Sequence, residues 1–148
     1  MNEVKVRALQ PDDAGVARVL VSRQLAGTLY ESRILEQLEI AIAGDDPECR
    51  ALVVIGPDGR GLALFGDVAG AAGVVKIHAL AGDDRVVLQA LARAVGDMGA
   101  RMIVCEIADD APFLVTAKAL RELGYEEGRV ADFVRDGVDL LILTWRSR

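Results

Sequence analysis

Three short apolar runs separated by turn-forming residues occupy the middle of the chain, at residues 51–55, 62–65 and 74–80. They are rich in β-branched and other aliphatic side chains, and runs of this length favour strands over helices. The segments between them, residues 56–59 and 70–73, are rich in glycine, which tight turns need. We therefore predict an antiparallel meander of three strands.

Helical spacing appears on both sides of this meander. Apolar residues recur at intervals of three and four over residues 12–25, 29–42 and 84–99, which is typical of amphipathic helices. The segment 44–47, which holds a glycine and a proline, ends the second helix, and Asp84 is placed to cap the third. The apolar face of the third helix is expected to comprise Val87, Leu88, Leu91, Val95 and Met98.

The remaining segments complete the order of elements. Residues 4–9 alternate apolar and polar side chains and residues 102–107 form another apolar run, so both are predicted strands. A fourth helix is predicted over residues 110–124, because an Asp-Ala-Pro sequence opens it and a Leu-Gly pair ends it. Residues 130–134 and 140–145 flank an Arg-Asp-Gly turn and predict a closing hairpin.

This order predicts an α/β fold over residues 1–148, as a single domain. Its centre is a mixed sheet of about seven strands flanked by four helices. A different mixed α/β domain is the alternative, and the strand order in a structure decides between them.

Charge and composition exclude several classes of partner. The chain has 17 basic and 23 acidic side chains, a net charge of −6 and only 4% aromatic residues, which disfavours binding to nucleic acid. No apolar run reaches the length of about 20 residues that a membrane-spanning helix needs. No signal or transit pattern is evident, so we expect a cytoplasmic protein without a membrane partner.

Two cysteines, Cys49 and Cys105, lie far apart in the chain. Neither has a second cysteine or a histidine at the spacing of metal ligands, so we predict buried, unreactive thiols and no metal site. The paired aspartates at residues 45–46 and 109–110 are interpreted as turn and cap residues. The glycine-rich residues 66–73 lack the Lys-Ser/Thr ending of a phosphate-binding P-loop, and we interpret them as a hairpin turn.

The element order and two local stretches resemble the GNAT superfamily of acetyl-CoA-dependent N-acetyltransferases. Residues 120–125, Leu-Arg-Glu-Leu-Gly-Tyr, are similar to the family's Leu-Gly-Phe helix ending, and residues 129–141 resemble its closing hairpin. The resemblance implies that acetyl-CoA or another acyl-CoA binds against the fourth strand. It also implies that the N-terminus of the following helix holds the diphosphate, where free N–H groups and the helix dipole favour an anion.

The cofactor contacts implied by the resemblance lie on the fourth strand and at the start of the next helix. The residues concerned are Ile77, Ala79, Leu80, Ala81, Gly82, Arg85 and Val86. In this chain the connecting loop has no glycine after Gly82 and is several residues shorter than the family's loop. Asp83 and Asp84 also place carboxylates where the diphosphate would lie, and Arg85 offsets only one of these charges. We therefore expect weak cofactor binding.

Candidate catalytic residues follow from the same resemblance. His78, the only histidine, lies where many family members carry a base, and imidazole with a reference pKa of about 6.5 can accept a proton at neutral pH. Glu106 and Tyr125 are expected near the opening of the cleft, where they can orient the acceptor or relay a proton. The family's frequent asparagine and tyrosine are replaced here by Phe113 and Leu120, which cannot act as acids or bases.

Two functions remain open on the sequence alone. The first is a weak acyl-CoA-dependent N-acyltransferase acting on a small-molecule or peptide amine, with Tyr30 and Glu31 in the wall of the acceptor pocket. The second is a catalytically inactive GNAT-fold binding or protein-interaction module, and purely structural roles for His78, Glu106 and Tyr125 are the matching alternative. A homodimer is left open as well.

Overall fold

The computed structural model describes residues 4–57 and 59–147. Within them the strands form one seven-stranded sheet with the order β1-β2-β3-β4-β5-β7-β6, so the predicted mixed sheet with four helices is confirmed. The strands are β1 (Arg7–Ala8), β2 (Arg50–Gly56), β3 (Gly59–Asp67), β4 (Val74–Gly82), β5 (Met102–Ala108), β6 (Glu126–Arg135) and β7 (Val138–Arg146). The helices are α1 (Ala14–Leu25), α2 (Glu31–Ala43), α3 (Arg85–Gly96) and α4 (Leu114–Glu122), with short 3-10 helices at Pro11–Asp13 (η1) and Ala111–Phe113 (η2).

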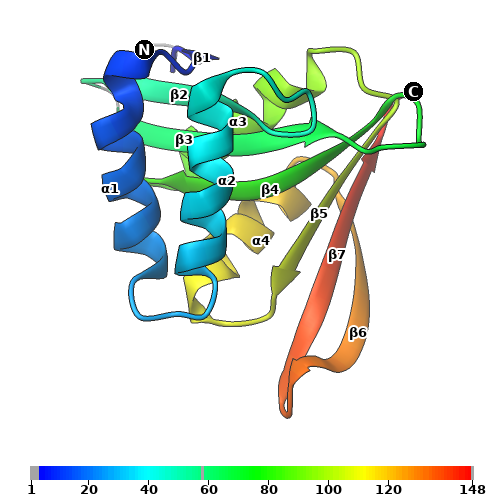
Figure 1. Ribbon diagram of the computed structural model, residues 1–148. Coiled ribbons are helices and arrows are strands. Elements are labelled where there is room, and N and C mark those ends of the chain that lie inside the picture. Colours follow the sequence, from blue (N-terminus) through cyan, green and yellow to red (C-terminus); the bar gives the residue numbers. More distant parts are fainter. Residues whose placement is uncertain (1–3, 58, 148) are drawn as a thin grey trace.

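Helices cover both faces of the sheet, α1 and α2 in front and α3 and α4 behind (Figure 1). One apolar core lies under α1 and α2, where Leu38 packs with Leu64. The other lies under α3 and α4, where Leu91 packs with Ile77 and Ile103. Strands covered on both faces need apolar side chains at every position, which explains the continuous apolar run that predicts β3. No helix in the described residues is long and apolar enough to cross a membrane.

Several predicted boundaries differ from the structure, among them the start of the closing hairpin, since β6 begins at Glu126 and not near residue 130. The strand predicted over residues 4–9 is reduced to β1, after which the Leu9 N–H still donates to the Ala51 carbonyl of β2. The Arg7 guanidinium donates to Asp13, where the chain turns into α1. The third helix ends at Gly96, before Met98, whose residue surface is 49% exposed instead of forming part of the apolar face.

The pairing of β4 changes along its length. Residues Val74 to Ile77 pair in parallel with β5, but beyond Ile77 none of the strands in residues 4–57 and 59–147 pairs with β4 on that side. On its other side Phe65 of β3 pairs with Ile77 and Leu64 pairs with Ala79. His78 is therefore the extra residue of a β-bulge, which bends the strand where it leaves β5.

Gly66 brings the segment before β2 against β3. A Cβ atom at Gly66 would lie 2.0 Å from the carbonyl carbon of Glu48, so only glycine leaves room for this crossing. The Asp67 N–H donates to the Pro47 carbonyl at 3.0 Å and fixes the segment. The crossing brings the Glu48 carbonyl within hydrogen-bond distance of His78.

Gly66→Ala is expected to lower the free energy of unfolding by about 3 kcal/mol, because the added methyl group meets backbone atoms that no side-chain rotation can move. Urea unfolding, followed by circular dichroism, measures this change in the free energy of unfolding. Gly15→Ala in α1 is the control: its added methyl meets no heavy atom within 4 Å, and it should raise the stability by up to about 1 kcal/mol. Equal stability of Gly66→Ala and the wild type would contradict the close approach.

Candidate active site

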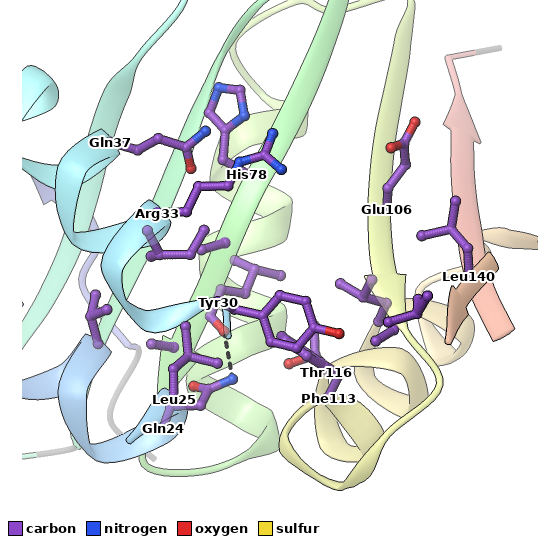
Figure 2. A pocket seen from close by; sticks show the side chains of 18 of the residues that line it. Gln24, Leu25, Tyr30, Arg33, Gln37, His78, Glu106, Phe113, Thr116 and Leu140 are labelled. Atoms are coloured by element: carbon purple, nitrogen blue, oxygen red, sulfur yellow. Dashed lines mark hydrogen bonds between the residues drawn. The ribbon is translucent and has the colours of Figure 1, made fainter. Parts of the chain in front are cut away.

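A pocket of about 350 Å³ lies where β4 and β5 part (Figure 2). Residues 78–81 of β4 line one side, and residues 106–108 of β5 line the other. Side chains of α2 and of the start of α4 close it above and below, and the walls are mainly apolar. A largely apolar concavity with a few polar groups is the usual form of a small-molecule site.

His78 lines this pocket, and one of its ring nitrogens has a hydrogen-bond partner. Nε2 is 2.8 Å from the Glu48 carbonyl oxygen. A carbonyl only accepts, so this bond requires the hydrogen on Nε2, and the neutral form of the ring then has its lone pair at Nδ1. The bond anchors the strand, as a structural role requires, and it also leaves a proton-accepting nitrogen.

Glu106 also lines the pocket and faces a cation that the sequence reasoning missed. Its Oε2 lies 3.6 Å from Lys76 Nζ, and the two side chains are 43% and 35% exposed. The period of two along a strand was the available signal, since it places Lys76 and His78 on the same face of β4. The pocket therefore holds a carboxylate, an ammonium and an imidazole where the strands separate, and the guanidinium of Arg33 on α2 lies beside the imidazole (Figure 2).

Tyr125 does not lie near the opening of the cleft, which corrects the sequence prediction. It is 6% exposed and belongs to the core under α3 and α4, and burial raises the pKa of its hydroxyl, with Cys105 as a second, smaller cause. The cause is the helix ending: Gly124 has φ +94° and the Tyr125 N–H donates to the Leu120 carbonyl at 3.1 Å. This turn sends the ring inward.

Three buried polar atoms in the described residues lack a hydrogen-bond partner, and all three belong to side chains that line the pocket. They are Tyr30 Oη, Gln37 Oε1 and Thr116 Oγ1. Buried polar groups are almost always paired in folded proteins, so these atoms require partners from outside the chain, either ordered waters or polar groups of a ligand. Tyr30 forms the pocket wall as expected, edge-on to Phe113 at 5.2 Å, whereas Glu31 is not among the lining residues.

The residues implied for the cofactor divide between several environments. Ala79, Leu80 and Ala81 line the pocket, while Ile77 is fully buried on the face under α3 and α4. The Asp83 N–H donates to the Arg60 carbonyl of β3. In an antiparallel pair the backbone groups of alternate residues face the neighbouring strand, so Asp83 and Ala81 face β3 and Leu80 does not. The N–H and carbonyl of Leu80 therefore point into the gap.

One side chain already occupies this free edge of β4. Gln24 Nε2, at the end of α1, lies 3.1 Å from the Leu80 carbonyl oxygen and 3.3 Å from that of Pro112 (Figure 2). The sequence gave no sign of this contact, because Gln24 is distant in the chain from both carbonyls.

Carboxylates occupy the start of α3. Asp84 accepts the Val87 N–H at 3.0 Å, which confirms the predicted cap, and Asp83 accepts the Arg60 N–H at 3.0 Å. Arg85 is paired with Glu122 at 3.1 Å, so it does not neutralise the aspartates. A neighbouring pocket of about 470 Å³ is bordered by Gly82, Asp83 and Asp84 and also by Arg23 and Arg60. Val86 is 56% exposed.

Comparison of whole sequences identifies no relative: no family model and no curated protein matches the chain. No three histidine, cysteine or acidic side chains in the described part of the chain are grouped so that they could hold a metal ion.

Solved structures do match, over nearly the full length. A protein assigned to the GNAT acetyltransferases from Desulfovibrio desulfuricans has a TM-score of 0.76 and 19% identity, covering 97% of this chain and 99% of that one. The aminoglycoside 6′-N-acetyltransferase from Enterococcus faecium has a TM-score of 0.74 and 12% identity, covering 96% of each. A protein described as an acetyltransferase from Salmonella typhimurium was solved with its cofactor acetyl-CoA. It has a TM-score of 0.68 and 15% identity, covering 98% of this chain and 94% of that one. The chain therefore has the GNAT fold.

Both cysteines are buried, as predicted, and neither is expected to react in the folded chain. Burial raises the pKa of Cys105 to about 12 and also raises the pKa of Cys49, so burial disfavours the reactive thiolate at both positions. We expect no labelling by iodoacetamide at pH 8 and labelling of both thiols in 8 M urea, with mass spectrometry as the readout. Modification of the folded chain at Cys105 would contradict this environment.

Proposed function

We propose that this chain is a divergent N-acyltransferase that transfers an acyl group from a thioester to a small-molecule or peptide amine bound between β4 and β5. The observation that carries the proposal is the parting of the two strands at the bulge of His78, which opens a pocket lined by His78 and Glu106. A fold of this kind holds acetyl-CoA in the Salmonella protein and serves amine acetylation in the Enterococcus enzyme.

The residues present fit one end of acyl-CoA and not the other. Along β4, residues 79–82 have no strand partner on the side of the gap, so the amide-bearing arm of a thioester can lie there as an added strand would. The diphosphate does not fit, because Asp84 brings negative charge to the start of α3 and already binds the Val87 N–H, while Arg60 beside it is engaged by Asp83. We infer weak affinity for acyl-CoA.

The pocket's own groups suit the handling of an amine. An alkylamine is protonated at neutral pH and must lose a proton before it can attack an acyl carbon, which the thioester supplies in activated form. Glu106 attracts the ammonium group to the β5 side of the pocket, and the Nδ1 lone pair of His78 accepts the proton. The neutral amine then attacks the acyl carbon, and the C–N bond forms as the thioester C–S bond breaks. Of the two protons that the ammonium nitrogen loses, one leaves on the thiol and one passes to solvent. Lys76 competes with the substrate ammonium for Glu106. Once the amine has become a neutral amide it no longer attracts Glu106, so Lys76 takes its place and favours release of the product.

A second function is favoured by a separate observation. The groups at the start of α3 that would bind a diphosphate are satisfied within the chain, by the Asp84 cap and by the pairing of Asp83 with Arg60. A binding module that accepts a small polar ligand in the same pocket, without acyl transfer, has no need of those groups. The unpaired Tyr30, Gln37 and Thr116 atoms are consistent with either function.

Incubation with acetyl-CoA and a panel of primary amines is expected to release CoA, measured by a thiol reagent, because the protein's own thiols are buried. His78→Ala should lower kcat/KM by about 100-fold or more, since general-base catalysis contributes at least that factor. Glu106→Gln should mainly raise KM for the amine. Glu36→Gln, an exposed change on α2, is the control. Absence of CoA release for every amine, despite ligand-induced thermal stabilisation, would leave the binding module as the function.

Asp84→Asn is expected to tighten CoA binding roughly fivefold, because it removes about 1 kcal/mol of repulsion at a solvent-exposed site and asparagine caps helices as well as aspartate. Isothermal titration calorimetry with CoA and with pantetheine, which lacks the diphosphate, measures the effect. Pantetheine affinity should not change. Equal gains for both ligands, or none for CoA, would show that the charge of Asp84 is not the obstacle.

A further inference from the structure

Gln24 ties together three elements around the free edge of β4. It lies in the last turn of α1, and its carboxamide nitrogen donates to the Leu80 carbonyl of β4 and to the Pro112 carbonyl just before α4. Leu80 lines the pocket between β4 and β5, and Pro112 lines the neighbouring pocket at the start of α3. The side chain of Gln24 lines both pockets and joins β4 to the segment before α4, at a boundary that we call the groove (Figure 2).

The position of Gln24 also marks the boundary between the two pockets. The pocket of about 350 Å³ between β4 and β5 and the pocket of about 470 Å³ at the start of α3 have only Gln24 and Thr116 as common lining residues. A ligand long enough to reach from the start of α3 to His78 must pass this point. It cannot pass while Gln24 holds both carbonyls.

The Leu80 carbonyl is the acceptor that an arm lying along β4 would use. Leu80 points its carbonyl into the gap, and in an added strand that group receives an amide N–H from the ligand. The Gln24 carboxamide is itself an amide donor, so it makes the same hydrogen bond. Thr116 Oγ1, buried and without a partner at the same boundary, is available to whichever amide occupies the groove.

We propose that Gln24 is an internal competitor for the amide-bearing arm of the acyl donor, which closes the groove in the empty chain and must rotate away before the arm can bind. The inference rests on the proposed function only in identifying the arm as that of a thioester donor. Because binding requires the open arrangement, the apparent dissociation constant is raised by the inverse of the fraction of chains that are open. Gln24 thus determines donor affinity separately from the aspartates of α3.

Calorimetric titration with pantetheine and with acetyl-CoA tests the competition on the wild type and on Gln24→Ala. We expect Gln24→Ala to bind both ligands at least tenfold more tightly. Gln89→Ala is the matched control, because Gln89 Nε2 also donates to a backbone carbonyl, that of Ala119 at 3.3 Å, and to Glu122 at 3.1 Å, but outside the groove. It should bind like the wild type. Unchanged or weaker binding by Gln24→Ala overturns the proposal.

A second variant guards against a loss of folding. Gln24→Asn keeps the carboxamide but shortens the side chain by one methylene, so we expect it to lose both hydrogen bonds and to show the same gain as Gln24→Ala. Thermal unfolding identifies variants that remain folded. If folded Gln24→Asn binds no more pantetheine than the wild type at millimolar concentration, Gln24 does not compete with the arm.

The outcome is separable from the proposed acyltransferase activity. Tighter pantetheine binding by Gln24→Ala without acylation of any amine would uphold the competition and remove the enzymatic function. If the wild type acylates an amine and Gln24→Ala binds pantetheine only as tightly as the wild type, the enzymatic function is upheld and the competition by Gln24 is removed. Pantetheine has no diphosphate, so the result is also independent of Asp83 and Asp84.

Discussion

The site depends on how β5 divides its hydrogen bonds between two neighbours. It pairs with β7 from Met102 to Ala108, but with β4 only as far as Cys105. The β6–β7 hairpin therefore carries the end of β5 away from β4, as the diverging strands in Figure 1 show. The bulge at His78 bends β4 at the same level, so the gap opens where a histidine and a free backbone edge are available.

The order of elements was predictable because periodicity and turn residues report it directly. Glycine at residue 44, with φ +83°, and the proline before α4 define helix ends that local sequence can reveal. The failure at residues 4–9 shows the limit of periodicity. Val4 and Val6 do pack against the core, so their alternation reports burial correctly, but burial of alternate side chains does not require that the backbone pair with β2.

The candidate site was only partly predictable, since it depends on geometry that local sequence does not contain. His78 and Glu106 could be found because histidine and glutamate are chemically distinct on apolar strands. The bulge is invisible in the continuous run of residues 74–80, and the turn of Tyr125 into the core depends on the sign of one φ angle at Gly124. Gln24 reaches a carbonyl 56 positions along the chain, a contact that only the tertiary fold creates.

The same backbone groups serve stability and ligand binding in this fold, and here several are satisfied internally. A helix cap such as Asp84 contributes about 1 kcal/mol, and each Gln24 hydrogen bond contributes about the same. A ligand that uses the start of α3 or the Leu80 carbonyl must replace those bonds, so its affinity is reduced by what they contribute to the empty chain. At His78 the two roles use different atoms. The bond to the Glu48 carbonyl uses Nε2 and holds the ring in place, and in the proposed reaction Nδ1 accepts the proton. Under the proposed function, these internal bonds lower donor affinity and stabilise the empty chain, while His78 keeps a nitrogen that proton transfer can use.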